Sequence, residues 1–240
     1  CPGDPEKSGH PLVVGAADVT APTGQGCACG AVIPGLDHHP KPPIPPSMNS
    51  MHPILLASGS PRRRELLKQL DVSFTVAPAN IDESICAGET PKDYVMRMAR
   101  EKALAGFEYS GGLMPALGSD TIVLLAGEVL GKPASRAEAE SMLQGLSGAT
   151  HQVYSSVAVA LAEDHVLDTL NITAVTFGEM PLEWIKKYCQ GDEPMDKAGA
   201  YAVQGGAGQY IRRIDGSYSG VMGLPLYETA ELLRRAELLA

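Results

Sequence analysis

The chain has 240 residues, 44% apolar and 5% aromatic, and its 19 basic and 28 acidic residues give a formal net charge of −9. This length is ample for a packed core, arranged as one large domain or two small ones. The acidic balance argues against a protein that coats duplex nucleic acid, because neutralising phosphates requires a basic face. No apolar run approaches the roughly 20 residues that span a bilayer, which excludes a transmembrane protein and predicts no membrane partner.

The first fifty residues differ in composition from the rest of the chain. Residues 1–50 hold 10 of the 19 Pro, 7 of the 26 Gly and no aromatic residue. Such a segment buries too little apolar area to offset the entropy of ordering it, roughly 1–2 kcal/mol per backbone residue. We therefore predict a flexible extension over residues 1–50 and a folded domain over residues 51–240, with Met48 or Met51 as a better initiator than Cys1.

The cysteines match neither a zinc site nor a disulfide framework. Cys27 and Cys29 are separated by one residue, whereas the cysteine pairs of structural zinc sites are usually separated by about two to four. We therefore interpret these two cysteines as unpaired side chains of the extension, in preference to a metal site that they would form with His38 and His39. The two cysteines of the folded domain lie far apart in the sequence and suggest no disulfide. This fits a reducing compartment and predicts a cytoplasmic protein.

From residue 53 onward, short apolar runs alternate with amphipathic stretches, which indicates a mixed α/β fold. Ser60 followed by Pro61 is typical of a helix start, and Ser135 with Glu138 forms a capping box. We predict strands over residues 54–57, 74–78, 116–125, 129–130, 151–161, 166–177, 200–203 and 210–214, and helices over 61–70, 91–107, 135–146, 181–190 and 226–239. The two long strands in the middle of the domain should pair antiparallel, because both alternate apolar with small or polar residues.

The turn between the first strand and the first helix is a candidate anion site. Residues 57–64 read Ala-Ser-Gly-Ser-Pro-Arg-Arg-Arg. A small, hydroxyl-rich turn at a helix N-terminus offers free N–H groups and the positive end of the helix dipole, and guanidinium groups bind phosphate bidentately. An ordinary capped helix with solvated arginines is the alternative. The turn is not a Walker A loop, because it lacks the Gly-Lys-Ser/Thr ending.

A second candidate is Asp120, which lies inside the otherwise apolar predicted strand. A carboxylate is expensive to bury unless it is paired or bound to a metal. An Asp that faces solvent on an edge strand is the alternative. Downstream, Lys132 stands between Gly131 and Pro133, where a turn would let its ammonium group reach a phosphate.

Two further segments carry possible chemistry. Residues 191–205 crowd acidic residues, Lys197, Tyr201, Gln204 and several glycines into a short stretch. A Gln amide can donate to and accept from a base edge at once, and glycine lets a ligand approach the backbone; a surface loop is the alternative. The pair Glu101-Lys102 lies on a predicted helix, where such a charged pair usually forms a solvated face.

Together these segments resemble the Maf family of nucleoside triphosphate pyrophosphatases. The matching stretches are LLASGSPRRRELL, REKA, GSDTIV, GKP, LSGATHQVYS, DEPMDKAGAYAVQG and GLPLYETAELL, in that order over about residues 53–235. The resemblance implies an α/β fold similar to inosine-triphosphate pyrophosphatases: a mixed sheet with flanking helices, two lobes around a central cleft, and frequent homodimers. It also implies hydrolysis of a nucleoside triphosphate to the monophosphate and pyrophosphate with Mg²⁺ or Mn²⁺, in nucleotide-pool housecleaning.

The resemblance also implies the site residues. Asp120 matches the family's catalytic base, and Glu83 its second acidic residue; these two are the candidates for holding the metal. The remaining positions would bind the substrate or select it: Ser58, Arg62, Arg63, Lys102, Lys132 and Lys197 hold the triphosphate, and Arg62, Thr121 and Gln204 determine the choice of base.

The form AGAYAVQG around Gln204 resembles the branch of the family that acts on dTTP and UTP, and possibly on modified pyrimidine nucleotides. The branch that acts on 7-methyl-GTP has a different sequence there. Two alternatives stay open at this point: a nucleotide-binding regulator of septum formation or cell division without catalysis, and a pyrophosphatase for another nucleotide such as 7-methyl-GTP.

Overall fold

The computed structural model describes residues 53–240. The predicted extension over residues 1–50, with its cysteine and histidine side chains and the expected start residues, lies outside this range. None of the helices within residues 53–240 combines the length and the apolar character needed to cross a bilayer.

The domain is a mixed α/β structure, as predicted. Its strands are β1 (Ile54–Leu56), β2 (Phe74–Val76), β3 (Ala116–Leu125), β4 (Glu128–Leu130), β5 (Thr150–Ala162), β6 (His165–Phe177) and β7 (Ile211–Asp215). Its α-helices are α1 (Pro61–Lys68), α2 (Pro91–Tyr109), α3 (Arg136–Leu146), α4 (Leu182–Tyr188), α5 (Tyr218–Met222) and α6 (Leu226–Arg235). Three 3₁₀ helices lie between α4 and β7: η1 (Glu193–Asp196), η2 (Ala198–Ala200) and η3 (Gly206–Tyr210).

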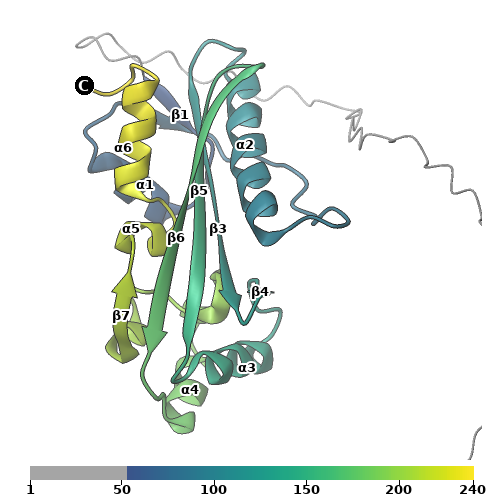
Figure 1. Ribbon diagram of the computed structural model, residues 1–240, viewed down its shortest axis with the longest axis vertical. Coiled ribbons are helices and arrows are strands. Elements are labelled where there is room, and N and C mark those ends of the chain that lie inside the picture. The colour runs from purple at the N-terminus through teal and green to yellow at the C-terminus, as the bar shows by residue number, and fades with distance from the viewer. Residues whose placement is uncertain (1–52) are drawn as a thin grey trace, which may run out of the picture. The chain divides into compact units, whose positions relative to one another are not determined.

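The strands form one seven-stranded sheet in the order β2-β1-β3-β5-β6-β7, with β4 on β3. β1 is parallel to β2 and β3, whereas β3 with β5, β5 with β6, and β6 with β7 are antiparallel. The predicted pairing of the two long strands is therefore confirmed. In Figure 1, β3, β5 and β6 run the length of the domain, with β1 beside the upper part of β3 and β4 beside its lower end.

One edge of β3 is open at its middle. Along its first residues β3 pairs with β1, at Ala116 and Leu117, and along its last residues, 123–125, it pairs with β4. Between them, residues 118–122 pair with β5 on one side, and no strand of the described domain covers their other side. The sheet therefore splits at this point, and it leaves room for a ligand beside a central strand.

Helices cover both faces of the sheet. α2 packs on β1, β3 and β5 through small side chains, including Ala99 and Ala103. α1 and α6 pack on the opposite face through leucines such as Leu67 and Leu232. α3, α4 and the 3₁₀ helices pack around Phe177 in a separate apolar cluster at the other end of the long strands (Figure 1). The opening in β3 thus lies between two separately packed groups of helices.

A glycine brings α2 close to β3. A Cβ atom added at Gly118 would lie 2.3 Å from the carbonyl oxygen of Ala99 and 2.4 Å from the backbone nitrogen of Ala103. Since side chains alternate along a strand, residue 120 lies on the same face as residue 118. The close approach at Gly118 therefore places α2 directly over Asp120.

Two expectations about local structure were wrong. Residues 200–203 were predicted as a strand, but Ala200 is the last residue of η2 and the next three form no strand. Gly199 and Ala200 have φ values of 69° and 59°, which extended backbone does not adopt. The last helix ends at Arg235 instead of residue 239, followed by Glu237 with a φ of 59°. The short helix α5 was not predicted.

His151 is a buried histidine at the start of β5, beside the apolar cluster around Phe177. Its side chain is 1% exposed, its Nε2 lies 2.7 Å from the Tyr201 hydroxyl, and its ring stacks on Phe177 at 5.5 Å. Burial lowers the pKa of His151 from 6.5 to about 4. The unfolded chain therefore binds a proton at His151 below about pH 6.5, whereas the native protein binds it only below about pH 4. The free energy of unfolding therefore falls as the pH falls from 6.5 to 4.

We expect this histidine alone to make the free energy of unfolding about 2 kcal/mol lower at pH 5 than at pH 7. Urea denaturation at both pH values, with wild type and His151→Gln, measures it. The difference between the two pH values should shrink by that amount in His151→Gln; His165→Gln, which replaces an exposed histidine, is the matched control. An unchanged difference in His151→Gln would contradict the prediction.

Candidate active site

The opening beside β3 continues into a pocket of about 840 Å³. Residues from both groups of helices line it, together with the middle of β3. All ten residues that the sequence singled out for the site contribute to its wall: Ser58, Arg62, Arg63, Glu83, Lys102, Asp120, Thr121, Lys132, Lys197 and Gln204. Segments separated along the chain by more than a hundred residues therefore meet in one cavity.

The turn before α1 forms one end of the pocket. Ser60 caps the helix, and its hydroxyl accepts a hydrogen bond from the backbone N–H of Arg63 at 3.5 Å, with Pro61 in the first turn. The Arg63 guanidinium donates from Nε to the carbonyl of Gly223 at 2.9 Å and from Nη1 to the Ser58 hydroxyl at 3.4 Å. The helix is therefore capped in the ordinary way, while Arg62 and Arg63 line the pocket.

At the centre of the pocket, one lysine joins two carboxylates. Lys102 Nζ lies 2.7 Å from Glu83 Oε1 and 2.7 Å from Asp120 Oδ1. The Lys102 side chain is 10% exposed and the Asp120 side chain 14%, whereas that of Glu83 is 58% exposed. The hydrogen bond from Lys102 is the main cause that lowers the pKa of Glu83, against partial burial, which raises it. The Glu83 carboxylate is therefore held in its ionised form.

This geometry decides two questions that the sequence left open. Asp120 does not face solvent, although β3 is open at this point, because its side chain is only 14% exposed and pairs with Lys102. Lys102 does not belong to a solvated helix face, because it is on the buried side of α2, in line with Val95 and Met98. A buried ammonium group needs a compensating charge, and two carboxylates provide it here.

The wall of the pocket carries further charged and polar side chains. Lys197 donates from Nζ to the carbonyl of Glu193 at 2.8 Å and also contacts the Asp196 carboxylate. Asp196 Oδ2 lies 3.5 Å from Arg62 Nη1, so this pair spans the pocket from η1 to α1. On β3, the Thr121 hydroxyl lies 3.0 Å from that of Ser155 on β5.

Sequence reasoning did not single out several residues of this site. Gly223 accepts hydrogen bonds from Arg63 Nε and, at 3.0 Å, from the Ser119 hydroxyl. Asp196 pairs with Arg62 across the pocket. Tyr94 lines the pocket and donates from its hydroxyl to the backbone carbonyl of Glu83 at 3.0 Å. No local pattern marked the Gly223 carbonyl, because any residue supplies one; only its position in space makes it a partner.

The fold and the pocket together define an α/β protein with a deep site, rich in cations, that suits a polyanionic ligand. The Maf-like protein family matches residues 53–236 of the chain. The dTTP/UTP pyrophosphatase of Escherichia coli K12 is 51% identical over 183 residues, which covers 76% of this chain and 92% of the relative. The chain therefore belongs to the Maf family.

Other known proteins are similar to the chain at different levels. The dTTP/UTP pyrophosphatase of Bordetella avium is 50% identical over 191 residues, or 76% of this chain and 94% of that protein. That of Pseudoalteromonas atlantica is 48% identical over 188 residues, or 77% and 97%. Among solved structures, a HAM1 protein from Coxiella burnetii aligns with a TM-score of 0.40 and 22% identity over 55% of this chain and 75% of its own.

Proposed function

We propose that the chain hydrolyses a nucleoside triphosphate between its α- and β-phosphates, releasing pyrophosphate and the nucleoside monophosphate. The observation that carries the proposal is the pair of carboxylates joined by Lys102, 2.7 Å from each, inside a pocket that Arg62, Arg63 and Lys132 also line. Phosphoryl and nucleotidyl transfer require mainly positioning and charge neutralisation, which a fixed set of cations around an ionised base supplies.

In this reaction Asp120 acts as the general base. Its carboxylate accepts a proton from a water molecule, whose oxygen forms a new bond to the α-phosphorus. The bond from the α-phosphorus to the bridging oxygen breaks, and pyrophosphate leaves with that oxygen and the bonding electrons. Lys102 keeps the Asp120 carboxylate in place through its 2.7 Å contact. The guanidinium groups of Arg62 and Arg63 neutralise the phosphates.

Glu83 and Asp120 fit a divalent cation that binds together with the substrate. Mg²⁺ is usually held by one or two carboxylates plus substrate phosphates instead of a complete protein cage. In agreement, two carboxylates converge on Lys102, and residues 53–240 contain no cluster of three or more His, Cys, Asp or Glu that would form such a cage. A bound Mg²⁺ or Mn²⁺ would offset phosphate charge and lower the pKa of a water molecule.

A pyrimidine nucleotide, dTTP or UTP, is the proposed substrate. The names of the three relatives at about 50% identity support this choice. The pocket lining contributes Gln204 and Thr121, whose amide and hydroxyl can pair with the acceptor-donor-acceptor edge of uracil or thymine. A cytoplasmic location and a homodimer stay predictions from the sequence.

One assay tests the reaction and the substrate class together. Purified full-length protein is incubated with Mg²⁺ or Mn²⁺ and a panel of nucleoside triphosphates, including dTTP, UTP and 7-methyl-GTP, and pyrophosphate is measured. Release from dTTP and UTP in preference to the others is expected. Release only from 7-methyl-GTP would overturn the choice of substrate, and no release from any nucleotide would favour a binding protein without catalysis.

Gln204→Ala should raise the KM for dTTP by roughly tenfold, because a lost hydrogen bond to the base costs about 1 kcal/mol or more. The preference for dTTP over other nucleotides should weaken at the same time, while kcat changes little. Steady-state kinetics with the same panel measure both quantities. Gln209→Ala is the matched control, since the Gln209 amide donates to the carbonyl of Gly206 within its own loop and is exposed. Unchanged base preference in Gln204→Ala would show that the base is recognised elsewhere.

A further inference from the structure

The segment that carries Glu83 has no helix or strand of its own. We call residues 77–90, between β2 and α2, the Glu83 loop; it contains only irregular backbone and one turn. The Glu83 side chain is 58% exposed and meets one partner, Lys102. The position of its carboxylate therefore depends on how the loop backbone is held, and packing of the side chain itself contributes little.

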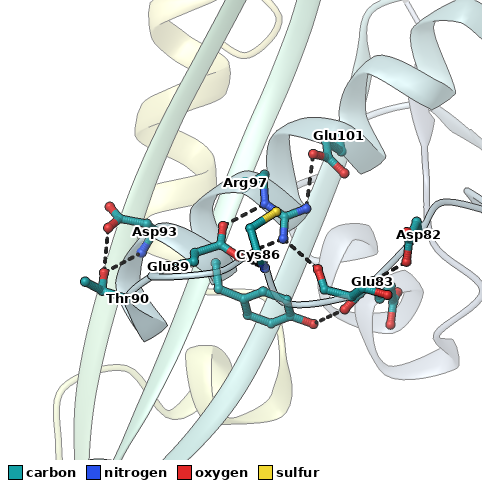
Figure 2. Close-up of polar contacts among 10 residues, drawn as sticks. Asp82, Glu83, Cys86, Glu89, Thr90, Asp93, Arg97 and Glu101 are labelled. Carbon is teal, nitrogen blue, oxygen red and sulfur yellow. Dashed lines mark hydrogen bonds and ion pairs between the residues drawn. The ribbon is translucent and has the colours of Figure 1, made fainter. Parts of the chain in front are cut away.

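One arginine of α2 holds this backbone. Arg97 donates from Nε to Glu89 Oε1 at 2.6 Å and from Nη2 to Glu89 Oε2 at 2.8 Å, a two-point pairing with the end of the loop. Nη2 also donates to the carbonyl of Ser84, the residue after Glu83, at 2.9 Å. Figure 2 shows the guanidinium group between these partners, with Nη1 directed to Glu101.

The contacts around Arg97 hold the second half of the loop, from Glu83 to Glu89. The Glu89 side chain is only 8% exposed and its Oε2 also accepts from the backbone N–H of Cys86 at 3.1 Å. Tyr94, whose ring lies 5.6 Å from the guanidinium carbon of Arg97, donates from its hydroxyl to the carbonyl of Glu83 at 3.0 Å. A bidentate charged pair is strong and directional. The loop is therefore clamped at Glu83 and along the residues that follow it.

The clamp and the catalytic lysine belong to the same rigid element. Arg97 and Lys102 both lie on α2, separated by five positions, or roughly 140° around the helix axis. Lys102 meets the Glu83 carboxylate from the buried side, and Arg97 holds the neighbouring backbone from a more exposed side. The distance between Glu83 and Asp120 is thereby set by one helix.

We propose that Arg97 is a positioning residue for Glu83: it clamps the Glu83 loop onto α2 and so places the carboxylate beside Lys102 and Asp120. The proposal rests on the proposed function for its effect on turnover, but the clamp itself is a property of the free protein. Arg97 does not itself line the pocket, so its effect on Glu83 passes through the loop and through Tyr94, whose ring it contacts.

The test compares Arg97→Met with Arg100→Met. Arg100 lies on the same helix and pairs with Asp168 on β6, away from the Glu83 loop. Because a misplacement of about 1 Å can cost roughly 10²-fold in rate, Arg97→Met should lower kcat by about 10- to 100-fold with KM changed less than about threefold. Arg100→Met should stay within about twofold of wild type. Arg97→Lys should recover only part of the loss, since an ammonium group cannot pair bidentately.

A double-mutant cycle separates positioning of Glu83 from a general loss of structure. In the Glu83→Gln background, Arg97→Met should lower kcat by less than about twofold, because the group that it positions is already missing. An equal loss in both backgrounds would overturn the proposal, as would wild-type kinetics for Arg97→Met.

A second readout does not depend on activity. The backbone amide of Cys86, protected by Glu89 in the wild type, should exchange with deuterium faster in Arg97→Met and at the wild-type rate in Arg100→Met. If the wild-type protein releases no pyrophosphate, the proposed function fails and amide exchange alone decides about the clamp. Unchanged exchange at Cys86 in Arg97→Met would then overturn it.

Discussion

Asp120→Asn should lower kcat by about 10²- to 10⁴-fold, the contribution that a positioned general base typically makes. The asparagine has the same shape as the aspartate and can still accept a hydrogen bond from Lys102, so the close packing at Gly118 and the fold should persist. It has no pair of electrons basic enough to take a proton from water at neutral pH. The loss should therefore appear in kcat, with little change in KM.

Pyrophosphate release from dTTP measures this effect, and circular dichroism with thermal unfolding checks that the fold is intact. Asp215→Asn is the matched control, because Asp215 pairs with Arg213 on the surface, where both side chains are at least 65% exposed. That variant should keep wild-type kinetics. If Asp120→Asn retained more than a tenth of the wild-type kcat, Asp120 would not be the base.

Lys102→Met should remove both activity and stability. It leaves the Asp120 carboxylate, 14% exposed, without its partner, and breaking such a pair costs roughly 3–5 kcal/mol when the remaining charge is fully buried. Water still reaches the more exposed Glu83, so we expect the lower end of that range, about 3 kcal/mol. Activity should fall by at least about 10²-fold, because the carboxylates lose their common anchor.

The remaining activity of Lys102→Met should depend on pH in a defined direction. Since the Lys102 hydrogen bond is the main cause that lowers the pKa of Glu83, its removal raises that pKa. The acidic limb of the pH profile of kcat/KM should therefore move to higher pH. Lys68→Met serves as control, because Lys68 pairs with Glu65 on an exposed face. An acidic limb at the wild-type position would contradict the assigned role of Lys102.

Most of the fold was predictable because its signals are local. The strand predicted over residues 116–125 matches β3, and the helix predicted from Pro91 matches α2 to within two residues at its end. Caps and apolar runs occupy a few adjacent positions, so they determine where an element begins. Residues 200–203 show the limit: all four are apolar and buried without forming a strand, and a short apolar run of this kind has the same pattern as a buried strand.

The family motifs named residues that line the pocket, but the local pattern misjudged the burial of Lys102. Lys102 follows the helical spacing of the apolar residues Val95, Met98 and Ala99, which places it on the buried face of α2. The expectation of a solvated face gave more weight to the charge of Lys102 than to its place in this helical spacing. The burial of Lys102 is tolerated only because Glu83 and Asp120, from two other segments, pair with it. The sequence of α2 does not indicate either carboxylate.

The sequence by itself determined the type and order of most elements, the family, and ten of the residues that line the pocket, because propensity, capping and ordered motifs reside in short stretches of chain. Only the tertiary structure decided that β3 is open beside Asp120, that one lysine joins two carboxylates, and that Arg97 holds the Glu83 loop. These features are pairings between distant segments, as between Arg63 and the carbonyl of Gly223, 160 positions apart. No local pattern encodes such a pairing, because it exists only once the sheet has brought the segments together.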